Sequence, residues 1–226
     1  MARFTPALTM MPHLIDARAV RYLEGLLPPR DPLLADLERQ AREERIPISG
    51  PQVGSLLALL IRLARPYRAL EVGAAIGYAA VWMGRALREY GGTLQTIELR
   101  PEMAERARAA VSRAELSDTV EVLEGAALEV LPRLSGSAYG LVFLDAAKSE
   151  YPAYFAYVVD MVSEGGLLLA DNALLGGEVA PEAPAGYWPA DAREGIRRYN
   201  ALAFTHPALD SVILPLHDGV TLSLKR

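Results

Sequence analysis

The chain has 226 residues, of which 51% are hydrophobic, and its 23 basic and 28 acidic side chains give a formal net charge of −5. This length and composition fit one α/β domain and exclude an intrinsically disordered chain. The acidic balance argues against a broad nucleic-acid-binding face, and the absence of cysteine excludes disulfides, catalytic thiolates and cysteine-ligated metal centres. The three widely spaced histidines also argue against a multi-histidine metal site.

The N-terminal part of the sequence predicts helices. Residues 16–45 indicate two short charged helices separated by a proline-rich segment, where Asp31 is placed to cap the second helix and Pro32 to begin it. The following helix, Gln52–Ala64, is apolar on nearly all sides, which fits either burial under the domain or a dimer contact. We expect one domain over residues 1–226, with a helical extension (1–45) and a cofactor- and metal-binding core (46–226).

No segment has the features of a membrane-spanning helix or of a targeting signal. The longest apolar stretch, around Leu56–Ile61, is interrupted by Arg62 and Arg65, far short of the ~20 residues that a spanning helix needs. The first residues lack the continuous apolar stretch of a signal peptide. We therefore expect a soluble, cytoplasmic protein without a membrane partner.

From residue 68 onward, strands and helices alternate, which predicts a mainly parallel sheet with helices on both faces. The predicted strands are 68–72, 92–98, 119–123, 140–145, 166–170, 212–215 and 219–224. The predicted helices are 78–89, 101–114, 126–134, 151–162 and 191–204. The short turn at 217–219 favours an antiparallel hairpin at the end. A long Gly/Pro/Ala-rich loop over 173–190 is typical of a functional loop.

Ligands of such sheets bind beyond the carboxyl ends of the strands, so the residues there are the first candidates. After the first strand, Gly73 and Gly77 allow a tight turn near a ligand, but Ala75 takes the place of the middle glycine of a dinucleotide-binding turn. Glu98 ends the second strand, 21 residues after Gly77 and near the offset of a ribose-binding acid. The small residues Gly125–Ala127 after the third strand leave room for a flat base.

Two further strand ends carry oxygen ligands. Asp145 ends the fourth strand, and Asp171 with Asn172 follows the fifth. If the strands are neighbours, these side chains converge within about 4.8 Å, and the repulsion between the two carboxylates favours a bridging cation. Two carboxylates and an amide suit a hard divalent ion, Mg²⁺ first, with Ca²⁺ and Mn²⁺ as alternatives.

Lys148 lies three residues after Asp145, and it is one of two lysines in a chain with 21 arginines. An arginine at this position could not act as a base, because its pKa exceeds about 12. A lysine beside a divalent cation can lose its proton near neutral pH, since the cation disfavours the ammonium form. The other interpretation is an ordinary surface lysine.

Together these motifs resemble the metal-dependent small-molecule O-methyltransferases, which include catechol and caffeoyl-CoA O-methyltransferases. The resemblance runs from about Ile46 to the C-terminus and is carried by Leu70–Tyr78, Glu98, Gly125–Ala127, Asp145–Lys148, Asp171-Asn172 and Asp218–Thr221. It implies a Rossmann-like methyltransferase fold, in which a seven-stranded, mostly parallel sheet has an antiparallel last strand. It also implies S-adenosylmethionine as cofactor and a homodimer.

The resemblance implies roles for individual residues. Lys148 would be the catalytic base, and the metal ligands would be Asp145, Asp171 and Asn172. The implied cofactor-binding residues are Ile48, Glu71, Gly73, Ala74, Gly77, Tyr78, Ala79, Glu98, Gly125, Ala126, Ala127 and Asp145. Ala79 departs from the serine that is usual in the family, and Ala147 from an aromatic residue of catechol-type members.

The expected reaction is methyl transfer to a hydroxyl of a catechol-like or caffeoyl-type aromatic. Tyr187 and Trp188, together with Met10 and Met11, are weaker candidates for substrate contacts and could instead be packing residues. A nicotinamide-dependent oxidoreductase and an inactive cofactor-binding relative remain alternatives, the first disfavoured by Ala75 and the second kept open by Ala79. A nucleic-acid methyltransferase is disfavoured by the charge and by the lack of an Asn/Asp-Pro-Pro-aromatic motif after the fourth strand.

Overall fold

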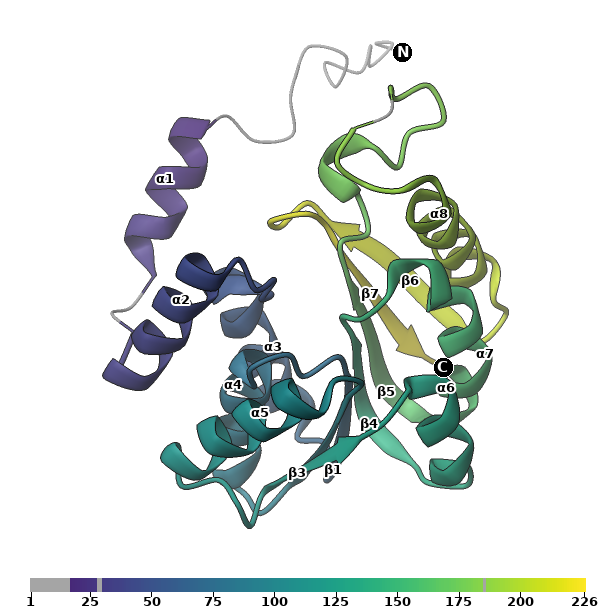
Figure 1. Cartoon of the computed structure of the whole chain (residues 1–226). Coiled ribbons are helices and arrows are strands. Elements are labelled where there is room, and N and C mark those ends of the chain that lie inside the picture. The colour runs from purple at the N-terminus through teal and green to yellow at the C-terminus, as the bar shows by residue number, and fades with distance from the viewer. Residues whose placement is uncertain (1–16, 28–29, 185) are drawn as a thin grey trace, which may run out of the picture.

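The computed structural model describes residues 17–27, 30–184 and 186–226, and a seven-stranded β-sheet forms its centre (Figure 1). The strands lie in the order β3-β2-β1-β4-β5-β7-β6. Their bounds are β1 (Arg68–Val72), β2 (Thr93–Glu98), β3 (Val120–Glu124), β4 (Tyr139–Leu144), β5 (Val162–Asp171), β6 (Leu209–Leu214) and β7 (Val220–Lys225).

The strand pairing confirms the predicted topology. β1 pairs in parallel with β2 on one side and with β4 on the other, and the parallel pairs β2–β3 and β4–β5 extend the sheet in both directions. The last strand, β7, is antiparallel to both β5 and β6 and lies between them. Because the strand order reverses between β1 and β4, a crevice is expected beyond their carboxyl ends.

Helices cover both faces of the sheet, with α3, α4 and α5 on one face and α6, α7 and α8 on the other (Figure 1). The α-helices are α1 (Ala17–Leu26), α2 (Pro32–Glu44), α3 (Gly50–Ala64), α4 (Tyr78–Arg88), α5 (Pro101–Arg113), α6 (Ala127–Val130), α7 (Tyr151–Met161) and α8 (Ala190–Thr205). The described residues also form the short 3-10 turns η2 (Leu131–Leu134), η3 (Lys148–Glu150) and η4 (Leu175–Gly177). In the described residues no helix combines the length and the apolar character needed to cross a bilayer.

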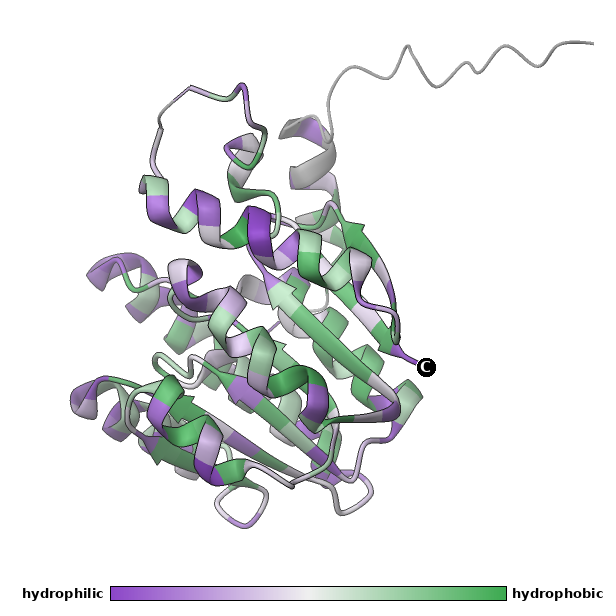
Figure 2. Ribbon diagram, turned by 90° about the vertical axis from the view of Figure 1, so that its right-hand side faces the viewer, coloured by the Kyte–Doolittle hydropathy of each residue, from purple (hydrophilic) through white to green (hydrophobic). Residues whose placement is uncertain are grey.

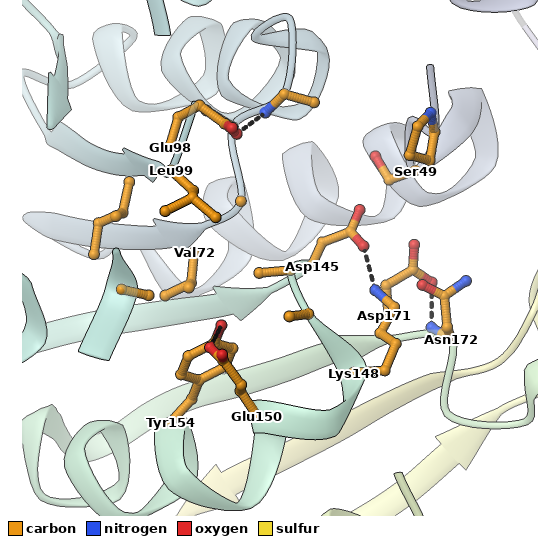
Figure 3. A pocket seen from close by; sticks show the side chains of 18 of the residues that line it. Ser49, Val72, Glu98, Leu99, Asp145, Lys148, Glu150, Tyr154, Asp171 and Asn172 are labelled. Carbon is orange, nitrogen blue, oxygen red and sulfur yellow. Dashed lines mark hydrogen bonds and ion pairs between the residues drawn. The ribbon is translucent and has the colours of Figure 1, made fainter. Parts of the chain in front are cut away.

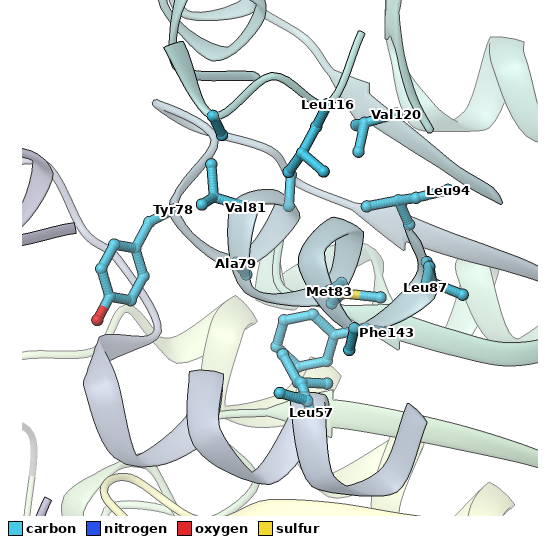
Figure 4. Packing of buried hydrophobic residues seen from close by; sticks show 14 of the residues in the cluster. Leu57, Tyr78, Ala79, Val81, Met83, Leu87, Leu94, Leu116, Val120 and Phe143 are labelled. Atoms are coloured by element: carbon cyan, nitrogen blue, oxygen red, sulfur yellow. The ribbon is translucent and has the colours of Figure 1, made fainter. Parts of the chain in front are cut away.

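The sheet separates two hydrophobic cores, so the central strand β4 has no charged residue and is hydrophobic on both faces (Figure 2). In β4, Leu141 and Phe143 face the core under α3 and α4, whereas Val142 and Leu144 face the core under α7. Figure 4 shows the first core, where Phe143 lies among side chains of α3 and α4. A strand buried on both faces is held rigidly, so the residues at its end are well placed.

Helix α2, in the N-terminal part of the chain, is attached to α4. The predicted cap is confirmed, because the Asp31 carboxylate accepts hydrogen bonds from the amides of Leu33 at 3.0 Å and Leu34 at 3.4 Å and also pairs with Arg85 of α4. A second link is the hydrogen bond that the Tyr78 hydroxyl donates to Glu38 at 2.8 Å.

Some predicted boundaries were wrong. The predicted helix 126–134 is interrupted after Val130 and continues as a 3-10 turn that contains Pro132. β5 begins at Val162 rather than at residue 166, across a shift of register that is accommodated at Gly165 (φ 73°). β6 covers Leu209–Leu214 and ends before Pro215, which has no amide hydrogen for the ladder.

Candidate functional site

A cavity of about 860 Å³ opens at the carboxyl ends of β1, β2, β4 and β5, where the strand order reverses (Figure 3). It brings together the predicted residues Ile48, Glu71, Gly73, Ala74, Tyr78, Ala79, Glu98, Gly125, Ala126, Ala127, Asp145, Lys148, Asp171, Asn172, Tyr187 and Trp188. Gly77 is not among its lining residues. Gly77 caps the N-terminus of α4 with a φ of 82°, and a Cβ on it would lie 3.1 Å from Ala107 Cα. Its role is therefore to shape the turn between β1 and α4.

The ends of β1 and β4 approach each other closely at Gly73. Its φ is 104°, and a Cβ on it would lie 2.1 Å from the carbonyl oxygen of Asp145. The Asp145 amide in turn donates to the Val72 carbonyl at 2.8 Å. Only glycine fits this backbone contact, which holds the turn after β1 against Asp145.

Two buried polar atoms on the wall of the cavity have no hydrogen-bond partner among the described residues. One is Oε1 of Glu71, whose other oxygen accepts from the Thr96 hydroxyl at 2.5 Å. Burial, with smaller effects from the charges of Asp145 and Glu98, raises the pKa of Glu71 to about 8. The other atom is the hydroxyl oxygen of Ser49, a residue that was not predicted from the sequence. Buried polar groups usually have partners, so both atoms are suited to a bound ligand.

Glu98 lies at the end of β2 with its carboxylate held by the backbone. Oε2 accepts from the Ala75 amide at 2.8 Å and Oε1 from the Arg100 amide at 3.0 Å. Leu99 and Gly125–Ala127 line the same cavity, so this end combines a fixed carboxylate with small and apolar residues. The combination suits a ribose and a flat base.

The predicted acidic pair is brought together by the strand register. Leu144 of β4 is opposite Ala170 of β5, so Asp145 and Asp171 follow a matched pair of residues. Asp171 is 1% exposed, and burial together with the neighbouring Asp145 carboxylate raises its pKa well above the ordinary value. Asn172 donates through Nδ2 to Asp218 at 3.3 Å, which leaves the oxygen of its amide available.

Lys148 points at this pair from η3. Its Nζ lies 2.7 Å from Oδ1 of Asp145 (Figure 3). The same Nζ lies 3.0 Å from the hydroxyl of Tyr151. The Tyr151 side chain is fully buried, and its hydroxyl donates to the Leu144 carbonyl at 3.0 Å. Helix α8 packs directly against the backbone of Lys148, since a Cβ on Gly195 of α8 would lie 2.3 Å from the Lys148 carbonyl oxygen.

Tyr151 was not predicted as a site residue, although its position in the sequence gave a signal. It follows Lys148 by three residues, about one helical turn, so the two side chains are expected on one side of the chain. His217 was also missed. It lines the cavity from the turn between β6 and β7 with a φ of 51°, and no sequence pattern indicated this position.

Tyr187 and Trp188 line the cavity from the loop between β5 and α8. Their rings meet edge to face with centroids 5.3 Å apart, and Tyr187 is 85% exposed. Met10 and Met11 lie outside the described residues.

A family model described as "O-methyltransferase" matches residues 30–226. The chain belongs to this O-methyltransferase family. The match begins before α2 and includes every strand of the sheet. With this assignment the protein is an S-adenosylmethionine-dependent enzyme, which confirms the predicted fold and, of the predicted cofactors, S-adenosylmethionine.

Curated relatives support the assignment over nearly the whole chain. A catechol O-methyltransferase of Niastella koreensis is 32% identical over 213 residues, which cover 90% of this chain and 94% of that protein. A catechol O-methyltransferase of Mycobacterium tuberculosis is 33% identical, with 91% and 94% covered.

Solved structures of O-methyltransferases share the fold. TomG of Streptomyces achromogenes in complex with SAM (S-adenosylmethionine) has a TM-score of 0.79 at 31% identity, covering 91% of this chain and 94% of its own. The Bacillus cereus enzyme in complex with SAH (S-adenosylhomocysteine) has a TM-score of 0.81 at 28% identity, covering 91% and 96%.

The donor set at Asp145, Asp171 and Asn172 also bears on a metal ion. Within the described segments, no group of three or more His, Cys, Asp and Glu side chains is arranged to hold a metal, so an acid pair would need the Asn172 amide as third ligand. Oxygen ligands of this kind suit a hard divalent cation, whose charge would offset the repulsion between the two buried acids. The residues therefore fit such an ion.

Proposed function

We propose that this O-methyltransferase methylates a hydroxyl of a vicinal dihydroxy aromatic of the catechol type, with a divalent cation and with Lys148 as the base. The observation that carries the proposal is the convergence of Asp145, Asp171, Asn172 and Lys148 on one cavity, beside a second region suited to a nucleoside. The catechol O-methyltransferase names of the two relatives support the choice of acceptor.

The cofactor would lie along the ends of β1, β2 and β3. Glu98 would accept hydrogen bonds from the ribose hydroxyls, and Ala126 and Ala127 would lie against the adenine. Oε1 of Glu71, which lacks a partner among the described residues, would accept a hydrogen bond from the ammonium of the methionine part. Ile48 and Ser49 would close that end of the cavity, where Ser49 offers a hydroxyl.

The reacting groups would meet between β4, β5 and η3. Asp145, Asp171 and Asn172 would hold the cation, which would act as a Lewis acid that lowers the pKa of a diol hydroxyl. Lys148 would accept the proton of that hydroxyl at Nζ. Tyr151 would orient Nζ, and the walls would hold the hydroxyl oxygen in line with the sulfonium methyl, which supplies much of the rate by orientation.

The charges around the cavity favour a small acceptor over a coenzyme A thioester. Among its described lining residues, Glu150 and Asp191 are exposed acids and Asp218 is a half-buried acid, whereas Arg100 is an exposed cation. A polyanionic thioester would meet net repulsion at this mouth. A neutral or cationic catechol would not.

Methyl transfer from S-adenosylmethionine tests the proposal. Catechol, caffeate, caffeoyl-CoA and a monohydroxy analogue are compared, each with Mg²⁺ and after chelation. We expect Mg²⁺-dependent methylation of catechol or caffeate, with caffeoyl-CoA the poorer acceptor. Turnover that survives chelation would contradict the requirement for a metal ion. Methylation of the monohydroxy analogue at the same rate would contradict the requirement for two vicinal hydroxyls.

The nicotinamide-dependent alternative is disfavoured by the family assignment. The turn after β1 also lacks the middle glycine that lets a pyrophosphate approach the backbone, because Ala75 takes that place.

A further inference from the structure

One carboxylate holds two consecutive backbone amides in the loop between β5 and α8. Oε1 of Glu178 accepts from the Tyr187 amide at 2.7 Å, and Oε2 accepts from the Trp188 amide at 3.1 Å. Hydrogen bonds to an ionised acceptor are stronger than neutral ones. The backbone that carries both aromatic rings is therefore tied to a single side chain nine residues earlier.

Glu178 is itself held on the other side. Arg197 of α8 donates to the carbonyl oxygens of Val179 at 2.8 Å, Ala180 at 3.0 Å and Glu178 at 3.3 Å. These bonds fix the first part of the loop to a helix. The Glu178 side chain then transmits this anchoring to the second part, at Tyr187 and Trp188.

A glycine makes room for the carboxylate. A Cβ on Gly186 would lie 2.4 Å from Oε1 and 2.6 Å from Cδ of Glu178. Any larger residue at 186 would displace the Glu178 carboxylate from the two amides.

The two rings differ in what holds them. Trp188 packs against the core under α7 and α8, whereas Tyr187 remains 85% exposed at the mouth of the cavity. Burial therefore does not set the position of the Tyr187 ring, and its fixed backbone and its edge-to-face contact with Trp188 do. An exposed ring fixed beside a cavity offers stacking area to an aromatic ligand at little cost in entropy.

We propose that Glu178 is a positioning residue for acceptor specificity, which holds Tyr187 as a preformed stacking wall for the ring of the acceptor. Glu178 does not touch the acceptor itself. The proposal rests on the proposed function only in that the acceptor is aromatic.

The first test needs no turnover. In a Trp82→Phe background, Trp188 is the remaining tryptophan, and acrylamide quenching reports how firmly its segment is held. We expect Glu178→Gln and Gly186→Ala each to raise the quenching constant of Trp188 at least twofold. The control Glu182→Gln changes an exposed acid of the same loop that makes no hydrogen bond or ion pair within the described residues, and we expect no effect. Equal quenching in all variants would overturn the proposal.

The second test separates positioning from a general structural role. We expect Glu178→Gln and Tyr187→Ala each to raise the KM for the acceptor about fivefold to tenfold, with kcat and the KM for S-adenosylmethionine nearly unchanged. The double variant should show no further increase, because both changes remove the same wall. Additive effects, or equal increases in both KM values, would overturn the proposal. If the wild-type enzyme methylates no aromatic diol, the proposed function fails, while the quenching test still decides the role of Glu178.

Discussion

The hydroxyl of Tyr151 accepts a hydrogen bond from Nζ of Lys148 at 3.0 Å and donates its own proton to the backbone at the end of β4. A second carbonyl, that of Asp171 at the end of β5, lies 3.3 Å from the same hydroxyl. One buried side chain thus connects the proposed base to the two strands that present the acidic pair. Because the backbone carbonyls take the Tyr151 proton, its oxygen is left to accept from Nζ, which fixes the direction of the lysine side chain.

Removing this hydroxyl should slow the reaction without weakening binding. We expect Tyr151→Phe to lower kcat about tenfold, the equivalent of one hydrogen bond of about 1.4 kcal/mol, with little change in either KM. Steady-state kinetics with saturating Mg²⁺ measure the effect. A large rise in KM at unchanged kcat would show that Tyr151 shapes the pocket rather than orienting Lys148.

Tyr199→Phe is the matched control for this variant. The Tyr199 ring lies 5.4 Å from the Tyr151 ring, and its buried hydroxyl has no partner among the described residues. We expect unchanged kcat and unchanged or slightly higher stability, because the substitution removes an unpaired buried polar group.

Replacing Lys148 by arginine tests the base directly. Lys148→Arg keeps a basic side chain beside Asp145 but replaces the proposed base by a guanidinium, whose pKa above about 12 prevents it from acting as a base. We expect kcat to fall by a factor of about 100 or more, with the thermal unfolding midpoint within a few degrees of wild type. Full turnover at neutral pH in a folded variant would rule out Lys148 as the base.

Metal binding can be measured by stability as well as by turnover. A cation that binds the folded state at about 100 times its Kd contributes about 2.7 kcal/mol, which raises the Tm of a domain of this size by roughly 5 to 10 °C. We expect this rise for the wild type with Mg²⁺ and most of it to be absent in Asp171→Asn. Equal shifts in both proteins would place the cation elsewhere.

The sequence predicted what depends on strand order, and missed what depends on packing between distant segments. Asp145 and Asp171 could be predicted as neighbours because parallel strands align their carboxyl ends, and Gly73 because a turn there needs a glycine. The sequence did not predict the role of the Ser49 hydroxyl or of the two amides held by Glu178. The contacts that place these groups come from other parts of the fold and from loop conformations without a repeating pattern. Tyr151 lies between these cases, because its spacing from Lys148 is visible but its buried partners are not.

Glu71 should oppose stability while it supports cofactor binding. Burial raises its pKa to about 8, so the folded protein binds a proton that the unfolded chain releases near pH 4.5. Stability is therefore greatest below pH 4.5 as far as this group is concerned, and falls as the pH rises toward 8. Glu71→Gln removes this dependence, so at pH 8 we expect the cofactor-free variant to be more stable than wild type by on the order of 2 kcal/mol, with little difference at pH 5. Thermal unfolding at both pH values measures this difference in stability. In the same variant the KM for S-adenosylmethionine should rise at least tenfold, because the ammonium of the methionine part loses its charged partner. A variant that is equally destabilised at both pH values would contradict this account, since it would show that the ionised carboxylate contributes net stability through Thr96.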